Sequence, residues 1–336
     1  MREAELYRKM PNDAVSCFLC QRRCYIKSGE WGWCKVRQNS RGKLYSRNWG
    51  KCAAFCVDPI EKKPFYHFMP GTRAFSFAAC GCSFSCLHCQ NWDISQPKEI
   101  IGQDAPPEEL AGKAARLGAE GMAYTYTEPT IFYEYAKDTA KIARKKGLYN
   151  VFVTNGYMTP EAIKGMDFID ASRIDLKAFT DKFYKEVCGG AYLEPVLKSI
   201  KLLHRKMHVE VITLLIPTLN DSDDEIRALS DWVAQLDRDV PLHFTGYYPA
   251  NKMTIRPTPV ETLERARKIA LDAGLNYVYT GNRPGDEGEN TYCPKCREKV
   301  IRRWGMEFLE SRLKEGNKCP ECGFSLPIVC DWRGKS

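Results

Sequence analysis

Three cysteines in the segment CSFSCLHC, Cys82, Cys86 and Cys89, follow the spacing C-x3-C-x2-C, and no fourth cysteine completes the pattern. A structural zinc ion takes four ligands, and an iron–sulfur cube has four iron corners to bind. Three local thiolates therefore indicate a site with one open coordination position. The alternative is a zinc site completed by a distant ligand, such as His67 or His88.

Two further cysteine groups flank this set, and each offers four thiolates. The N-terminal group has the spacing C-x2-C-x3-C-x9-C and comprises Cys17, Cys20, Cys24 and Cys34. It fits structural zinc or an auxiliary iron–sulfur cluster; the spacing does not separate the two metals, and zinc is the interpretation we favour. The C-terminal group, from CPKC and CPEC, comprises Cys293, Cys296, Cys319 and Cys322. Its paired knuckles indicate a zinc ribbon, with a rubredoxin-like iron site as the alternative.

Five cysteines lie outside these groups: Cys52, Cys56, Cys80, Cys188 and Cys330. We expect most of them to be buried and to pack as small hydrophobic residues. Cys188, in the segment VCGG, has the alternative of facing the active-site cavity as a hydrogen-atom donor.

The elements that must position these residues alternate along the chain from Ala74 onward. β-Branched or aromatic runs such as AFSFAA, YNVFVTN and HVEVITLLIP alternate with amphipathic patterns such as IFYEYAKDTAKIARKKG. This alternation predicts a parallel α/β fold, and six or seven units predict a complete or partial (β/α) barrel. The open cysteine set follows the first strand, at the end where such a barrel places its active site.

The chain divides into three expected segments. Residues 1–70 form a Cys-rich metal-binding segment, residues 71–285 a partial (β/α)6-type barrel, and residues 286–336 a zinc-ribbon-like domain. Their net charges are +8, −1 and +1. The basic N-terminal segment fits a patch for RNA or an acidic protein, but solvated lysines around a metal knuckle are the favoured interpretation.

The location of the protein follows from two absences. No stretch approaches about 18 uncharged apolar residues, so we expect no membrane span. The start, MREAELYRKMPNDAV, lacks the apolar run of a secretory signal, which predicts a cytoplasmic protein. In a reducing cytoplasm the clustered cysteines indicate metal ligands rather than disulfides.

The C-x3-C-x2-C motif after the first strand resembles the signature of radical S-adenosylmethionine (radical SAM) enzymes. The resemblance implies a [4Fe–4S] cluster on Cys82, Cys86 and Cys89 whose open iron chelates S-adenosylmethionine. Reductive cleavage of this cofactor would then give methionine and a 5′-deoxyadenosyl radical that abstracts a hydrogen atom. The residue before the third cysteine is usually aromatic in this family; here it is His88, whose imidazole would pack over the adenine.

Later strand ends resemble the same family. TYTEPT stands where the family holds the amino group of the cofactor, which implies this role for Thr127 and Glu128. TNGY and DLK resemble segments of glycyl-radical-activating enzymes, and imply that Asn155, Asp175 and Lys177 contact the cofactor or the substrate. Taken singly, each of these residues also fits a helix cap or a rim ion pair, and for Asn155 the two interpretations have about equal weight.

The segment LIPTLNDSDDE looks like the one that meets the ribose and carboxylate of the cofactor. Its Asn220 and Asp221 fit that role or a helix cap, and for Asp221 we favour the cap.

Longer stretches give a closer resemblance over nearly the whole chain. CFLCQRRCYIKSGEWGWCKVR, VDPIEKKPFYHFMPGT, TPVETLERARKIA and NTYCPKC resemble the radical SAM family of the AmmeMemoRadiSam system, which is similar to pyruvate formate-lyase-activating enzymes. The resemblance implies Memo-like and AMMECR-type proteins as candidate partners. The chemistry also needs an electron donor such as flavodoxin or ferredoxin. The histidine that those activating enzymes carry after the sixth strand is absent from GYYPANKM, which weakens the case for a glycyl-radical substrate.

Three functions are consistent with the sequence. We favour a radical SAM enzyme that abstracts hydrogen from a macromolecule, most simply a protein, because two metal-binding appendages beside a barrel provide surfaces for a large substrate. The first alternative is an RNA-modifying enzyme, in which Arg22, Arg23, Lys35 and Arg37 grip phosphates. The second is a non-enzymatic scaffold in which all the clustered cysteines bind zinc.

Overall fold

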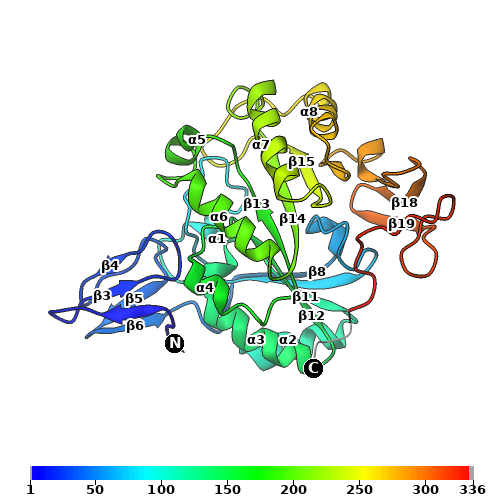
Figure 1. Cartoon of the computed structure of the whole chain (residues 1–336). Coiled ribbons are helices and arrows are strands. Elements are labelled where there is room, and N and C mark those ends of the chain that lie inside the picture. Colours follow the sequence, from blue (N-terminus) through cyan, green and yellow to red (C-terminus); the bar gives the residue numbers. More distant parts are fainter. Residues whose placement is uncertain (1, 333–336) are drawn as a thin grey trace.

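The core of the molecule is one eight-stranded sheet, seen in a computed structural model that describes residues 2–332 (Figure 1). The strand order is β16-β15-β14-β13-β12-β11-β9-β8; β8 is antiparallel to its neighbour, and the other seven strands are parallel. The strands are β8 (Ala54–Pro59), β9 (Arg73–Ala78), β11 (Gly121–Tyr124), β12 (Tyr149–Thr154), β13 (Ala171–Asp175), β14 (His208–Leu215), β15 (Leu242–Gly246) and β16 (Val278–Gly281).

Helices connect the parallel strands and cover the sheet. The central strands β11 and β12 are buried at every position, as expected for parallel strands with both faces covered. The helical elements are η1 (Ile60–Lys62), α1 (Trp92–Ser95), α2 (Pro107–Arg116), η2 (Pro129–Phe132), α3 (Tyr133–Lys145), α4 (Pro160–Lys164), α5 (Asp181–Glu186), α6 (Leu193–His204), α7 (Asp223–Leu236), α8 (Val260–Asp272) and η3 (Glu287–Glu289). The predicted strand–helix alternation is confirmed.

The sheet is open rather than closed. Within residues 2–332 no pairing joins its end strands β16 and β8, so the fold is a partial and not a complete barrel. The antiparallel edge strand β8 comes from the segment that the sequence assigns to the N-terminal metal-binding region. The boundaries of the three predicted segments stay predictions.

Two small appendages lie on opposite sides of the core (Figure 1). The N-terminal one has two three-stranded sheets: β1 (Arg2–Glu3), β6 (Lys43–Ser46) and β5 (Arg37–Ser40), and β2 (Tyr7–Lys9), β3 (Val15–Cys17) and β4 (Tyr25–Ile26). A two-stranded pair, β7 (Lys51–Cys52) and β10 (Gln103–Asp104), follows. The C-terminal sheet comprises β17 (Thr291–Tyr292), β18 (Lys299–Trp304) and β19 (Glu307–Ser311).

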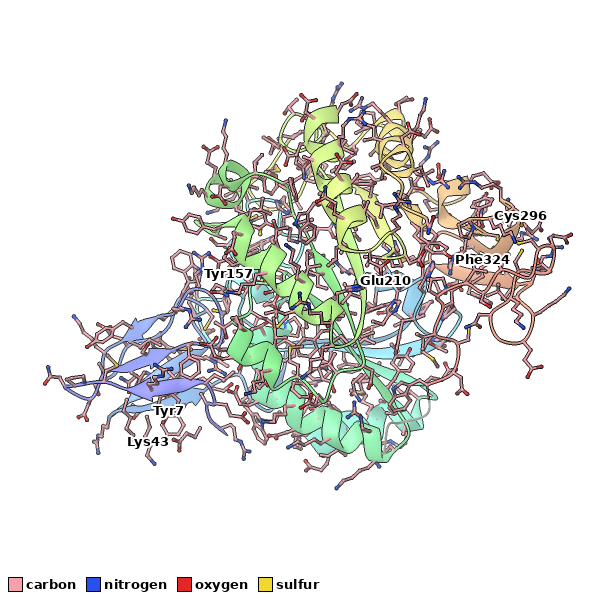
Figure 2. All side chains as sticks on the ribbon, in the orientation of Figure 1. Tyr7, Lys43, Tyr157, Glu210, Cys296 and Phe324 are labelled. Carbon is pink, nitrogen blue, oxygen red and sulfur yellow. The ribbon has the colours of Figure 1, made fainter. Side chains whose placement is uncertain are left out.

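A buried carboxylate fastens the segment after β8 to the sheet. Glu210, in the interior of the core in Figure 2, accepts hydrogen bonds from the backbone N–H groups of Tyr66 and His67 and contacts His243 Nε2 at 2.7 Å. Burial alone would raise the pKa of Glu210, but its hydrogen bonds with His208 and His243 hold it well below the ordinary value. This network joins residues far apart in the sequence below the active-site end of the strands.

The structure confirms that most of the five unclustered cysteines are buried, and it corrects the expected helix cap at Asp221. Cys52, Cys80 and Cys188 are buried as predicted, but Cys56 and Cys330 are exposed. The cap of α7 is Ser222, whose hydroxyl accepts from the Glu225 N–H at 3.3 Å. Asp221 accepts instead from the Thr218 N–H, within the preceding loop.

Asn220 is buried and closes the same loop: its amide oxygen accepts from the Ile216 N–H, and its amide nitrogen donates to the Lys177 carbonyl at 2.8 Å.

No helix within residues 2–332 is both long enough and apolar enough to cross a membrane.

Candidate active site

The loop after β9 places the open cysteine set at the C-terminal ends of the parallel strands. Gly81 begins this loop with φ +102°, a conformation that side chains rarely adopt, and a Cβ there would lie 2.7 Å from Val36 Cγ1. The loop is also held from the N-terminal appendage: the Arg22 Nε donates to the Ser83 carbonyl at 2.9 Å. The position of the set directly after the first parallel strand agrees with the sequence expectation.

One cavity of about 370 Å³ gathers most of the predicted site residues. Cys82, Cys86, His88 and Cys89 line it from the loop, together with Thr127 after β11, Asn155 after β12, and Asp175 and Lys177 at the end of β13. Side chains from four successive strand ends therefore meet at one place, as the parallel topology requires.

The cysteine sulfurs of this set receive hydrogen bonds from their surroundings. The Phe84 N–H lies 3.3 Å from Cys82 Sγ, the Asn155 amide lies 3.7 Å from the same sulfur, and the Ser95 hydroxyl contacts Cys89 Sγ at 3.2 Å. Burial raises the pKa of Cys82 and Cys89 above the ordinary value for a thiol. At neutral pH these thiols therefore stay protonated unless a bound metal ion supplies compensating positive charge.

Cys188 lies beside this set without lining the cavity. A hydrogen bond with Cys188, followed by burial, raises the pKa of Cys86. Because Cys188 is fully buried behind the loop, its packing role agrees with the default expectation.

His88 lines the cavity and contains an unsatisfied polar atom. The ring is 5% exposed, and within the described residues its Nδ1 has no hydrogen-bond partner. Burial, with Lys177 nearby, lowers the pKa of His88 to about 3, so the imidazole is neutral at physiological pH. A buried polar atom without a partner is costly, which indicates that a bound molecule supplies the missing partner.

Glu128 lies behind the cavity wall. Its carboxylate accepts from the Thr130 N–H at 3.0 Å, from the Thr154 hydroxyl at 2.6 Å and from the Asn155 N–H at 2.8 Å. The side chain is completely buried and is not part of the cavity lining, whereas Thr127 is. The geometry thus gives Glu128 the position of a residue that orients Asn155.

A row of charges forms the cavity wall at the end of β13. Asp175 forms an ion pair with Arg173 and accepts from Lys177 Nζ at 2.7 Å. Arg173 also donates from Nε to the Lys63 carbonyl at 3.3 Å, which joins β13 to the segment after η1. Two cations share one carboxylate here, so this wall carries net positive charge.

The sequence analysis missed a second group of cavity residues. Lys63 Nζ donates to Asp58 at 2.7 Å and lies 3.5 Å from the Tyr126 hydroxyl. Burial alone would raise the pKa of Asp58, but its hydrogen bonds with Lys62 and Lys63 hold it well below the ordinary value. Tyr126 has φ +68°, a strained backbone for a bulky residue, and such strain clusters at functional sites. The charged segment VDPIEKKP, which contains Asp58 and Lys63, was the one sequence feature that pointed to this group. No local pattern links this segment to Tyr126.

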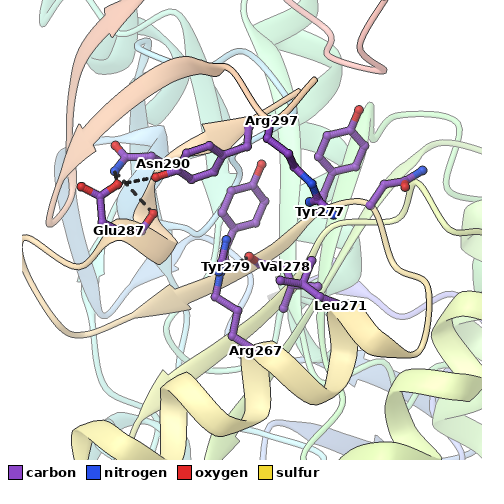
Figure 3. A pocket seen from close by; sticks show the side chains of 10 residues that line it. Arg267, Leu271, Tyr277, Val278, Tyr279, Glu287, Asn290 and Arg297 are labelled. Atoms are coloured by element: carbon purple, nitrogen blue, oxygen red, sulfur yellow. Dashed lines mark hydrogen bonds between the residues drawn. The ribbon is translucent and has the colours of Figure 1, made fainter. Parts of the chain in front are cut away.

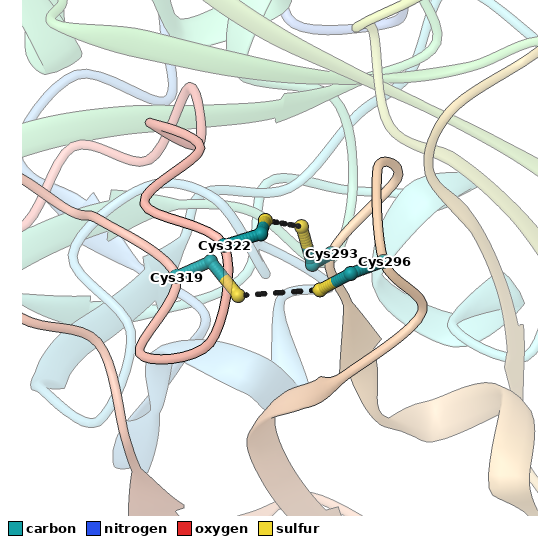
Figure 4. Close-up of side chains that lie close together, drawn as sticks. All are labelled: Cys293, Cys296, Cys319 and Cys322. Atoms are coloured by element: carbon teal, nitrogen blue, oxygen red, sulfur yellow. Dashed lines mark hydrogen bonds between the residues drawn. The ribbon is translucent and has the colours of Figure 1, made fainter.

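The C-terminal cysteines form a compact group (Figure 4). Cys293 and Cys322 have their sulfurs 3.6 Å apart, and those of Cys296 and Cys319 are 3.5 Å apart. All four sulfurs lie within 4.8 Å of one another, as ligands of a single metal ion do. The predicted four-cysteine group is therefore confirmed as a group that could hold a metal.

A second cavity, of about 280 Å³, lies between α8 and the C-terminal sheet (Figure 3). Tyr277, Tyr279 and Arg267 contribute to its wall, and Asn290 Nδ2 donates to the Glu287 carboxylate at 3.3 Å. It contains none of the clustered cysteines and none of the predicted cofactor contacts.

Comparison with known proteins decides the family. The sequence profile of the Radical SAM superfamily matches residues 78–231, the range that holds the open cysteine set and the strand ends around the cavity. The chain is also 47% identical to the uncharacterized protein MJ0808 of Methanocaldococcus jannaschii, over 98% of this chain and all of the relative. The chain belongs to the radical SAM superfamily.

More distant relatives are similar over parts of the chain. The choline trimethylamine-lyase activating enzyme of Oleidesulfovibrio alaskensis is 26% identical over 42% of this chain and 43% of its own length. The solved structure of a domain of a pyruvate-formate lyase-activating enzyme from Bacteroides vulgatus has a TM-score of 0.43 and 21% identity, covering 49% of this chain and all of that domain.

Radical SAM enzymes bind a [4Fe–4S] cluster and S-adenosylmethionine, and the residues of the cavity fit both. Three thiols at one side leave one iron corner open, as the chelation of S-adenosylmethionine requires. Beside them, the unpartnered nitrogen of His88 and the charged side chains of Asp175 and Lys177 can bind the polar groups of a charged ligand.

Proposed function

We propose that this protein is a radical SAM enzyme that abstracts a hydrogen atom from a protein substrate. The observation that carries the choice of substrate is the composition of the cavity mouth. Met306, in the turn between β18 and β19, lines the same cavity as the open cysteine set, so the C-terminal appendage contributes directly to the entrance.

This entrance offers apolar side chains to a partner. Trp304, Met306 and Leu309 on the β18–β19 hairpin are exposed large hydrophobic residues. Exposed aromatic and Met side chains are typical of surfaces that bind protein segments. A peptide that packs on this hairpin would reach the cavity beside Met306.

The cavity residues singled out from the sequence each have a proposed role. Cys82, Cys86 and Cys89 hold the cluster, which when bound supplies the electron that cleaves S-adenosylmethionine and so generates the hydrogen-abstracting 5′-deoxyadenosyl radical. Thr127 and Asn155 bind the cofactor, with Glu128 fixing the backbone of Asn155.

The charged wall and the histidine complete the assignment. Asp175 and Lys177 contact the cofactor or the substrate, and His88 packs beside the adenine and finds there the partner that its Nδ1 lacks within the described protein. The four C-terminal cysteines bind zinc, which shapes the hairpin at the entrance. We further propose flavodoxin or ferredoxin as the electron donor, and Memo-like and AMMECR-type proteins as candidate partners.

The arrangement of the N-terminal basic residues argues against RNA as the substrate. Arg37 is completely buried, and Arg22 donates to the carbonyls of Ser83, Gly189 and Gly190. Two of the four cations expected to grip phosphates are thus engaged inside the protein. The contribution of this segment to phosphate binding is correspondingly reduced.

Transfer of deuterium into 5′-deoxyadenosine tests the proposal. Cells that make this protein are grown in deuterated medium, and their extract is offered to the unlabelled, reduced enzyme with unlabelled S-adenosylmethionine. We expect deuterated 5′-deoxyadenosine from the macromolecular fraction, and its loss after protease but not after ribonuclease treatment. Loss after ribonuclease alone, or deuterium transfer only from the low-molecular-weight filtrate, would contradict a protein substrate.

A further inference from the structure

The four N-terminal cysteines converge on one enclosed site. Cys17, at the end of β3, lines a small cavity together with Cys20, Cys24 and Cys34 from the surrounding loops. Three of these side chains are buried and Cys24 is partly exposed. All four thiols of the set thus face one place, with no position left open for a substrate.

The separation of their sulfurs distinguishes between the two candidate metals. Zinc binds thiolates at about 2.3 Å, so four sulfurs in a tetrahedron around it lie about 3.8 Å apart. The C-terminal cysteines meet this condition, with sulfur separations of 3.6 and 3.5 Å. Among residues 2–332 they are the only group of three or more candidate ligands within 4.8 Å of one another, so no three N-terminal sulfurs are that close.

The open cysteine set provides an internal reference for the wider spacing. Cys82, Cys86 and Cys89 likewise fall outside the 4.8 Å limit within the described residues, although the family binds an iron–sulfur cube there. In a cube each thiolate takes its own iron, which holds the sulfurs farther apart than a single ion does. Like those of the open set, the N-terminal sulfurs are therefore spread more widely than the C-terminal sulfurs, which favours a cluster over a single zinc ion.

The surroundings of the N-terminal sulfurs suit a buried negative charge. Arg37 lines the cavity, its NH1 group lies 3.8 Å from Cys17 Sγ, and its guanidinium is paired with Glu134. Its Nε has no hydrogen-bond partner among the described residues. The Trp33 N–H donates to Cys24 Sγ at 3.5 Å. The N–H groups of Trp33 and Arg37 beside the sulfurs can donate to thiolate ligands and tune the potential of a bound cluster.

The N-terminal set also lies next to the open set. Cys34 and Cys82 line the same cavity, of about 250 Å³, which contains Trp33 on the N-terminal side and Phe84 on the other. Cys80, two residues before Cys82, packs with Cys20 and Cys34 in one buried cluster. The two metal sites are therefore neighbours across a single packed interface.

We propose that Cys17, Cys20, Cys24 and Cys34 bind a second [4Fe–4S] cluster, which delivers electrons to the cluster held by Cys82, Cys86 and Cys89. Four thiolates occupy all its corners, so its chemistry is restricted to electron transfer. A reduced flavodoxin or ferredoxin loses one electron, which takes the N-terminal cluster from the 2+ to the 1+ state. This electron then passes to the open cluster, whose charge falls by one, and the N-terminal cluster returns to 2+. The relay rests on the proposed function; the metal assignment does not.

Metal analysis of anaerobically prepared protein tests the assignment. We expect about eight irons and one zinc per chain in the wild type, and about four irons in a Cys82→Ala/Cys86→Ala/Cys89→Ala variant. That variant keeps the N-terminal set intact, and its reduced cluster should give an electron paramagnetic resonance signal that does not change on adding S-adenosylmethionine. A Cys17→Ala/Cys20→Ala variant should retain the other four irons, and Cys330→Ala, outside both sites, should retain all eight.

About four irons and two zincs in the wild type would overturn the assignment, and so would a triple variant free of iron. Iron that stays at the wild-type level in the triple variant would instead overturn the proposed function.

The relay is tested by comparing two reductants. With a reduced flavodoxin as donor, the Cys17→Ala/Cys20→Ala variant should reduce its open cluster at least 10-fold more slowly than the wild type, read from the part of the electron paramagnetic resonance signal that changes on adding S-adenosylmethionine. With a small titanium(III) reductant, which reaches the open cluster directly, this part of the signal should be equal in the two proteins. Equal rates with flavodoxin would overturn the relay.

Discussion

At the scale of single residues, side chains reach the active-site cavity in two ways, by their place directly after a strand and by long-range packing. Cys82, Asn155 and Lys177 each follow a strand, and their convergence results from parallel topology alone. The contact of Lys63 with Tyr126 joins residues 63 positions apart, and no periodic pattern in the sequence predicts this contact. Glu128 matched its motif, yet its four hydrogen bonds place it behind the cavity wall.

His67 gives a pH-dependent prediction at this scale. It is fully buried, its Nε2 lies 2.6 Å from the Tyr279 hydroxyl, and burial lowers its pKa to about 3. The unfolded state, with a pKa of about 6.5, binds the proton first as the pH falls, so His67 lowers the free energy of unfolding below that pH. The stability advantage of the wild type over His67→Gln should shrink by about 1.4 kcal/mol between pH 7.5 and 5.5.

The measurement is the gap in thermal midpoint between the two proteins, each carrying its metals, across this pH range. Because both proteins share every other titrating group, the gap isolates His67. A gap that does not change with pH would contradict a neutral, buried imidazole.

At the scale of elements, the alternation of strands and helices in the sequence predicted the parallel sheet. The edge strand β8 could not be predicted in this way, because it is fixed by pairing with β9 rather than by a pattern of its own. The parallel strands β11 to β15 are buried at nearly every position, as expected for strands covered on both faces, although β12 to β15 also carry polar residues. β8 pairs antiparallel with β9, but its exposed positions resemble those of a loop. The N-terminal appendage likewise contains strands of only two to four residues, too short for an alternation signal.

Gly81 connects the N-terminal appendage to the cysteine loop, and this contact gives a prediction. In Gly81→Ala the new Cβ would lie 2.7 Å from Val36 Cγ1 and 3.0 Å from the Cys34 carbonyl oxygen, so the loop must shift. We expect a loss of about 2–4 kcal/mol in the free energy of unfolding, together with reduced iron retention.

Gly118→Ala is the matched control, because Gly118 also has a left-handed φ, of +69°, but no atom within 4 Å of the added Cβ. Gly118→Ala should lower the free energy of unfolding by only about 1 kcal/mol and leave the iron content unchanged. Equal effects of the two substitutions on stability and iron content would mean that the packing of Gly81 against Val36 does not hold the loop.

At the scale of the whole molecule, both appendages are attached to the core by buried contacts. On the C-terminal side, Arg303 donates to the Tyr66 carbonyl at 2.9 Å, and Tyr277 and Tyr279 pack against Cys293 and Cys319. On the N-terminal side, the ion pair of Arg37 with Glu134 is completely buried. The sequence predicted two metal-binding appendages, but not that both would contribute residues to cavities at the open cysteine set.

Removal of the C-terminal metal tests this organisation. A Cys319→Ala/Cys322→Ala variant should lose one zinc per chain and keep its iron, since among residues 2–332 the four C-terminal sulfurs of the wild type are the group close enough to share a single ion. Its thermal midpoint should fall, because metal binding contributes directly to the folding free energy of such a ribbon. Elemental analysis and calorimetry give both readouts, with Cys330→Ala as the control. Loss of one iron with no change in zinc would contradict a zinc ribbon and indicate a rubredoxin-like site.

The most direct test of the central claim is the cleavage of S-adenosylmethionine itself. Anaerobic, cluster-loaded protein is reduced in the presence of S-adenosylmethionine, and the released 5′-deoxyadenosine and methionine are quantified by mass spectrometry for the wild type and for Cys86→Ala. We predict equal amounts of the two products from the wild type and none above background from the variant. Wild-type protein that holds its full iron complement yet releases no 5′-deoxyadenosine would contradict the assignment of this cavity as a radical SAM active site.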